Sequence, residues 1–136
     1  MIRIEEGPSR YDLCDQVIGA AMTVHSTLGS GFLESVYQNA LIWELRKRGL
    51  KTDPEKPITV RYDGRIVGAF MADLLVNELL IVELKAIETL AKIHEVQVVN
   101  YLTATGLDEG LLLNFGSERL EYRKKFRLRV KDPVSP

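Results

Sequence analysis

Cysteine is almost absent from this chain of 136 residues, which contains only Cys14. A single cysteine excludes an intrachain disulfide and a cysteine-based zinc site. The apolar neighbours Leu13, Val17 and Ile18 predict that Cys14 is a small core residue. Because a chain without disulfides suits a reducing compartment, we expect a cytoplasmic location.

Long apolar runs are also missing. No stretch approaches the roughly 20 residues that a helix needs to cross a bilayer, so we expect no membrane association. The charged first six residues are not followed by an apolar segment, which argues against a signal peptide. With 46% hydrophobic and 27% charged residues, the composition is that of a soluble globular protein. We expect one domain over residues 1–136, with residues 1–10 and 131–136 as flexible ends.

Net charge is small, at −1, but its distribution is uneven. Seven basic residues against one acid give the stretch 119–131 a charge of +6, so the remainder carries −7. A basic strand on an acidic body could follow the phosphates of a nucleic acid. It could equally be a charged edge strand that resists aggregation. The bases are Arg119, Arg123, Lys124, Lys125, Arg127, Arg129 and Lys131, and the acid is Glu121.

Hydrophobic spacing predicts three helices, each followed by a glycine that can cap its C-terminus. Two prolines, in Asp53-Pro54 and Lys56-Pro57, predict a break before a half-buried strand. Asp63-Gly64 then predicts a hairpin. The predicted helices cover residues 11–28, about 33–48 and roughly 93–105. The predicted strands cover 58–62, 66–70 continuing through 72–76, 79–84, 110–115 and 120–130.

This order of elements predicts an α/β sandwich, with a mixed central sheet flanked by helices. The strands before residue 85 form a three-strand antiparallel meander. The helix around residues 93–105 serves as a crossover, so strands 79–84 and 110–115 should be parallel, with a right-handed connection.

The most informative stretch runs from Asp73 to Lys85. Asn77-Glu78 separates two apolar runs there, and Asn tolerates positive φ, so we predict a hairpin. The second run should be buried on both faces, yet it ends in Glu83 and Lys85, which point the same way on a strand. The hairpin folds Asp73 back beside them. Two acids and an amine at strand ends would form a hard-cation site suited to phosphodiester hydrolysis, although an isolated Glu-x-Lys is more often an ordinary ion pair.

Five further polar residues have both a structural and a functional interpretation. His94, Gln97 and Tyr101 share one stripe of the third predicted helix, which is either a solvated face or part of a site. Glu34 and His25 lie in the first and last turns of their helices, where the helix dipole favours their charges.

The sequence resembles the GxxExxY protein family over about residues 11–127. Its signature stretch is Gly31-Phe32-Leu33-Glu34-Ser35-Val36-Tyr37. The accompanying motifs are His25 with Leu28-Gly29, Ala72 to Val76, Val82 to Ala86, His94-Glu95-x-Gln97, Asn100-Tyr101-Leu102 and Leu111 to Gly116. That family resembles a branch of the PD-(D/E)xK nuclease superfamily of the RecB-like type. The resemblance implies a restriction-endonuclease-like fold with a core of helix, three-strand meander, helix and strand.

The resemblance also implies a set of metal ligands. Asp73 and Glu83 resemble the two metal-binding acids, and the backbone carbonyl of Leu84 would join them. Glu34 resembles the carboxylate that the first core helix offers to the metal. His25 matches a histidine that often lies upstream in the RecB-like branch. The implied cofactor is Mg²⁺ or Mn²⁺. Met71-Ala72 stands where the superfamily name implies a proline.

Lys85 resembles the lysine of the motif, and Gln97-x-x-x-Tyr101 resembles the Gln-x-x-x-Tyr motif. We therefore expect a metal-dependent nuclease that acts on nucleic acid, with DNA as the first candidate, and a homo-oligomer is left open. The alternatives are a domain that keeps the fold but mainly binds nucleic acid or a partner, and a structural domain with an internal salt-bridge network. The expected catalytic residues are Asp73, Glu83, Lys85, Glu34, Gln97 and Tyr101, and the other family-motif residues are Gly31, Tyr37 and His94.

Overall fold

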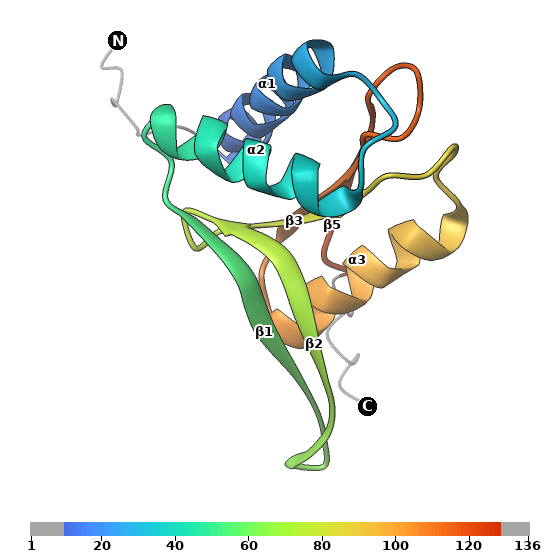
Figure 1. Cartoon of the computed structure of the whole chain (residues 1–136). Coiled ribbons are helices and arrows are strands. Elements are labelled where there is room, and N and C mark those ends of the chain that lie inside the picture. The colour runs from blue at the N-terminus through green and yellow to red at the C-terminus, as the bar shows by residue number, and fades with distance from the viewer. Residues whose placement is uncertain (1–9, 129–136) are drawn as a thin grey trace, which may run out of the picture.

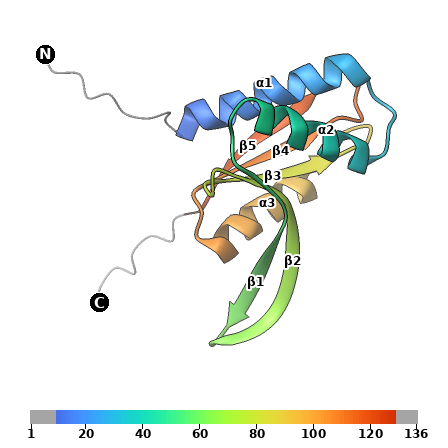
Figure 2. The same ribbon diagram turned by 60° about the vertical axis from the view of Figure 1, so that its left-hand side comes forward.

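The computed structural model describes residues 10–128 and has helices on both faces of a five-strand sheet (Figures 1 and 2). The predicted α/β sandwich and the order of its elements are confirmed. Arg10 already belongs to the first helix, and the remainder of both predicted flexible ends lies outside the described residues. The elements are α1 (Arg10–Leu28), α2 (Glu34–Lys47), β1 (Thr52–Tyr62), β2 (Arg65–Val76), β3 (Leu80–Lys85), α3 (Lys92–Thr105), β4 (Glu109–Asn114) and β5 (Glu121–Phe126).

The sheet has the order β1-β2-β3-β4-β5, with β3 and β4 parallel and the other neighbours antiparallel. The predicted meander and the parallel crossover through α3 are therefore confirmed. β3 is buried on both faces up to its last residue, Lys85, as its continuous apolar run predicts. No helix within residues 10–128 has the length and apolar character needed to span a bilayer.

Two apolar cores lie on opposite faces of the sheet. The larger joins α1 and α2 to the sheet, and Cys14, which is 2% exposed, belongs to it as predicted. The smaller lies under α3 and includes Ile58, Ile81 and Tyr101. Neighbouring residues of a strand serve different cores, because successive side chains point to opposite faces. Ile81 therefore packs under α3 while Val82 packs under the other two helices.

β1 starts earlier than predicted, at Thr52, and includes the two prolines that were expected to break the chain. It is an edge strand, where a residue without an N–H costs no ladder hydrogen bond on the open side. The left-handed φ of 54° at Glu55 bends the strand between Pro54 and Pro57. Together with the distal part of β2, β1 forms a long hairpin that projects from the body of the protein (Figures 1 and 2). We call this projecting hairpin, residues 56–71, the arm.

The other edge strand, β5, ends at Phe126 rather than at residue 130, and residues 129 and 130 lie outside the described part. Three basic side chains, two on β5 and one just after it, pair with acids outside the strand. Such exposed pairs add little stability, but they occupy charges that would otherwise be offered to phosphates. These three residues fit the charged edge strand, whereas Arg129 and Lys131 lie outside the described residues. The pairs are Lys124–Asp15 at 2.9 Å, Lys125–Glu95 at 3.2 Å and Arg127–Asp108 at 3.0 Å.

Candidate metal centre at the parting of two strands

The hairpin that joins β2 to β3 places two acids opposite each other. Asn77 and Glu78 both have positive φ, at 51° and 58°, as a tight two-residue turn requires. The amide of Leu79 donates to the carbonyl of Val76 at 3.0 Å and closes the turn. Strand pairing continues only as far as residues 74 and 82, so the next facing pair is Asp73 and Glu83. The predicted hairpin is confirmed.

Where β2 and β3 separate, hydrogen bonds to side chains replace the hydrogen bonds between the two backbones. The amide of Asp73 donates to Oε1 of Glu83 at 3.0 Å, and the amide of Leu84 donates to Oδ2 of Asp73 at 2.8 Å. Each carboxylate thus caps the backbone of the opposite strand. These bonds hold both acids on the face of the sheet that α3 covers, where the carboxyl group of Glu83 also forms a side-chain hydrogen bond with Asp73.

Glu83 is only 5% exposed. Burial, and then the neighbouring charge of Asp73, raise the pKa of its carboxyl to about 8. Two carboxylates that share a buried position disfavour each other's charged form unless a cation compensates. The two acids therefore offer oxygen donors, and a hard divalent cation would compensate their charge once both are ionised.

Lys85 follows Glu83 on the same face of β3, as the period of a strand requires. It lowers the pKa of Glu83, although burial outweighs this effect. Within residues 10–128 its ammonium group forms no ion pair with either acid. Lys85 instead lines a hollow of about 460 Å³ together with Gln97 and His94. Lys85 thus belongs both to the strand end that carries Glu83 and to the wall of this hollow.

The polar stripe of α3 faces this site and not solvent. Tyr101 is 6% exposed, and its pKa is raised by burial and then by the charges of Glu83 and Asp73. Gln97 lies one turn earlier on the same stripe and is half-buried. The structure therefore brings the predicted pair Gln97 and Tyr101 to the acids and the lysine.

α2 reaches the site through a residue that the sequence analysis did not identify. Nε2 of Gln38 donates to the backbone carbonyl of Asp73 at 3.1 Å and fastens the start of the helix to β2. Glu34 lies one turn before Gln38. The pKa of Glu34 is raised by burial and by Asp73, and lowered by Lys85, so it interacts with the same charges. The only signal for Gln38 was its helical spacing from Glu34.

The other residues of the signature stretch shape the loop that positions Glu34 at the start of α2. Gly31 has a φ of +113°, a conformation that favours glycine. The hydroxyl of Tyr37 donates to the carbonyl of Gly29 at 2.5 Å and accepts from the amide of Phe32 at 3.2 Å. Tyr37 is fully buried and stacks on Phe115, with ring centroids 4.8 Å apart. Glycine and tyrosine thus form the loop from which α2 starts.

His94 caps α3 and borders the site. Its Nδ1 accepts from the amide of Ala91 at 2.9 Å, so the neutral ring must carry its proton on Nε2. The ring lines the hollow that contains Lys85 and Gln97. The structure therefore places this family-motif residue next to the lysine, which its motif alone did not reveal.

The contacts of His25 are with a different loop. Its Nε2 donates to the carbonyl of Ser117 at 3.0 Å, and its ring is tilted against Phe115. It lines a separate hollow with Met22 and Glu118, and the lining of that hollow contains none of the acids at the strand ends. The contacts found for His25 are those of a residue that fastens the loop after β4 to α1.

Asn114, the last residue of β4, and Gly116 hold the loop that follows Lys85, and the sequence analysis gave them no individual role. Asn114 is fully buried, and its side chain bonds both the amide and the carbonyl of Ile87. Gly116 touches the same loop so closely that a Cβ would lie 2.3 Å from the nitrogen of Ile87. Both residues belong to the motif Leu111 to Gly116 of the resemblance, which indicated the stretch but not the contacts of its residues.

Within residues 10–128, no three side chains of His, Cys, Asp or Glu form a group that could hold an ion by themselves. A cation between Asp73 and Glu83 would need further oxygen donors, from the backbone or from water, which is usual for Mg²⁺. The backbone carbonyl of Leu84 and a water held by Glu34 are the predicted sources.

The chain is similar to a known protein family and to a solved structure. A family model described as the PD-(D/E)XK nuclease superfamily matches residues 11–126. A solved chain described as "Crystal structure of SSO0001" superposes with a TM-score of 0.57 at 15% identity, covering 92% of this chain and 70% of that one. No curated protein matches. The structural similarity supports the restriction-endonuclease-like fold that the sequence predicted.

Proposed function

The chain belongs to the PD-(D/E)XK nuclease superfamily, and on that basis we propose that it is a divalent-metal-dependent nuclease that hydrolyses phosphodiester bonds in DNA. The observation that carries the proposal is the parting of β2 and β3. There, the carboxylates of Asp73 and Glu83 meet beside a lysine whose ammonium group is not paired with them. The motif match to the GxxExxY family and to its RecB-like relatives supports the same activity.

Asp73, Glu83 and the carbonyl of Leu84 would hold Mg²⁺ or Mn²⁺, with Glu34 contributing directly or through water. Such an ion would activate water and neutralise the charge that develops on the phosphate. His25 stays a predicted ligand only, since its contacts join it to a different loop.

The other polar side chains would bind and orient the attacking water and the phosphate. Lys85 lines the hollow on the α3 side of the sheet, and its ammonium group would donate to the attacking water or to a phosphate oxygen and stabilise developing charge. Gln97 and Tyr101 supply an amide and a hydroxyl on the same side and would position water or phosphate by hydrogen bonds. Burial by α3 keeps bulk water from Glu83 and strengthens these interactions.

The test is a cleavage assay with Asp73→Asn and Lys85→Met. Asp73→Asn keeps an acceptor for the amide of Leu84, and Lys85→Met keeps the aliphatic chain, so both variants should fold, as checked by circular dichroism. Each should lower cleavage of DNA in Mg²⁺ or Mn²⁺ by at least about 100-fold, as expected for loss of a transition-state electrostatic contact. Glu88→Gln, a change at an exposed acid outside the site, is the matched control. Full cleavage by either site variant would refute the proposal.

A wild-type protein that binds DNA with Mg²⁺ but cuts no substrate in a panel of single strands, duplexes and RNA would instead indicate a binding domain that keeps the nuclease fold. The panel would also distinguish cutting at ends from cutting within a strand.

A further inference from the structure

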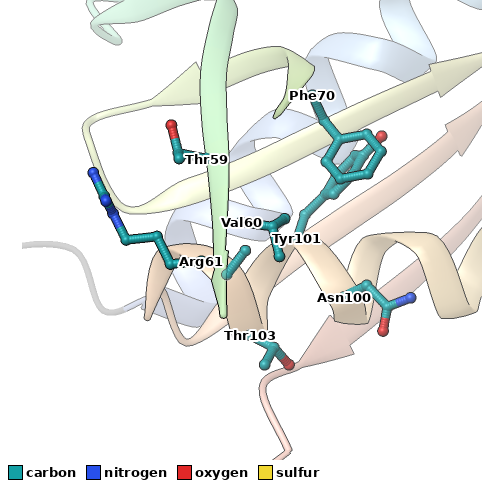
Figure 3. A pocket seen from close by; sticks show the side chains of 8 residues that line it. Thr59, Val60, Arg61, Phe70, Asn100, Tyr101 and Thr103 are labelled. Carbon is teal, nitrogen blue, oxygen red and sulfur yellow. The ribbon is translucent and has the colours of Figure 1, made fainter. Parts of the chain in front are cut away.

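Two hollows between the arm and α3 meet at the same two residues. The inner hollow, which holds Lys85, and an outer one of about 560 Å³ are both lined by Phe70 and Asn100. The outer hollow lies between α3 and the side of the arm formed by residues 59–61 and Phe70 (Figure 3). Because they share these two residues, the hollows lie next to each other along α3, and the inner one is lined by Lys85 of the candidate site. We call the two hollows together the arm groove.

The arm groove contains no carboxylate. Neither hollow has an Asp or Glu among its lining residues, although the whole chain has 19 of them. Its lining includes Arg61 at the outer end and Lys85 at the inner end, with a histidine, amides and hydroxyls between them. This combination of cations and hydrogen-bonding groups is complementary to a polyanion.

Phe70 lines both hollows. Its side chain is 44% exposed, and its ring is tilted on Tyr101 with centroids 5.5 Å apart. Figure 3 shows the two rings side by side, with Asn100 and Thr103 on the neighbouring turns of α3. A supported and exposed aromatic ring is a stacking surface for a base. A duplex cannot use it without unpairing, because its bases already stack on one another.

We propose that the arm groove binds a single nucleic-acid strand and leads it to Lys85, which follows Glu83 on the same face of β3. Arg61 contacts a backbone phosphate, one base stacks on Phe70, and the next phosphate enters the inner hollow beside Lys85. The inference deepens the proposed function by naming its substrate class as an unpaired strand. The strand is held between the arm and α3, so the projecting hairpin is a wall of the binding site.

The test measures binding without cleavage. Fluorescence anisotropy in EDTA would compare a labelled oligothymidylate of 12 nucleotides with a hairpin duplex of the same charge. The wild type should bind the single strand about tenfold more tightly. Phe70→Ala should weaken single-strand binding by about tenfold, the usual effect of one lost base stack, whereas Phe70→Trp should preserve it. Phe70→Leu keeps apolar packing on Tyr101 and should still lose affinity, which separates stacking from folding.

Arg61→Ala should lower the slope of log Kd against log salt by about 0.7, the value for one phosphate contact on a single strand. The arm offers matched controls. Arg65 and Tyr62 are exposed on the same hairpin but line neither hollow. Arg65→Ala and Tyr62→Ala should therefore bind as the wild type does. Thermal melting of every variant confirms that the arm is still folded.

Two results would overturn the proposal. One is a duplex bound as tightly as the single strand, and the other is unchanged binding by both Phe70→Leu and Arg61→Ala. The nuclease proposal is decided separately. A wild type that binds single strands through Phe70 but never cuts would refute only the nuclease, and a nuclease that cuts while its Phe70 and Arg61 variants bind normally would refute only the groove.

Discussion

Glu83→Gln should change how the stability of the metal-free protein depends on pH. Burial, and then Asp73, raise the pKa of Glu83 from 4.5 to about 8, so the folded state holds this proton more tightly than the unfolded chain does. The stability that the Glu83 carboxyl contributes is therefore fully present below its pKa in the unfolded chain. It is lost as the pH rises through its pKa in the folded protein. At 1.36 kcal/mol per pH unit, the loss has an upper limit of about 5 kcal/mol.

Urea unfolding in EDTA at pH 5.5, 7 and 9 measures this loss. The glutamine keeps an oxygen for the amide of Asp73 but cannot ionise, so Glu83→Gln should lose less stability than the wild type between pH 5.5 and 9. Glu88→Gln is the control and should follow the wild type. Saturating Mn²⁺ should restore stability at pH 9 in the wild type only, since the ion binds the folded, ionised pair. Parallel pH profiles for the wild type and Glu83→Gln would refute the buried-pair reasoning.

Two further substitutions test the supports of the site. Tyr37→Phe removes the hydroxyl that bonds the loop before α2 at two points. It should cost about 1–3 kcal/mol in urea unfolding and lower cleavage, because that loop presents Glu34; an unchanged unfolding midpoint would contradict this role. Gly116→Ala would place a Cβ against the backbone of Ile87 and should destabilise by at least about 2 kcal/mol, whereas Gly68→Ala, which meets only ordinary contacts, should be nearly neutral. Equal losses of stability in the two variants would show that the loop after β3 can move away from the added Cβ at no cost.

Local patterns were enough to predict most elements of the fold. The continuous apolar run of β3 and the Asn77-Glu78 turn determine the hairpin without reference to the rest of the chain, because both act within a few residues. The same holds for α1, where apolar spacing and the following Gly29 predicted the observed end. β1 was the exception. Its two prolines disfavour an inner strand, and only its place at the sheet edge makes them acceptable.

The candidate site was predictable in its residue types but not in its geometry. The resemblance selected Asp73, Glu83 and Lys85, yet it did not show that each acid caps the opposite strand. It also grouped His25 with the metal ligands, whereas the structure joins its ring to Ser117. Contacts between distant segments depend on how helices pack on the sheet, and no local pattern encodes that.

By itself, the amino-acid sequence determined which residues can ionise, where strands and helices form, and that two acids and a lysine lie near a hairpin. Tertiary structure alone decided that Gln38 fastens α2 to Asp73, that the bases of β5 are already paired, and that Phe70 lines both hollows of the arm groove. The physical reason is the distance along the chain over which each effect acts. Backbone preference and periodicity act between neighbours, while burial, charge compensation and the shape of a groove arise only when segments far apart in the chain come into contact.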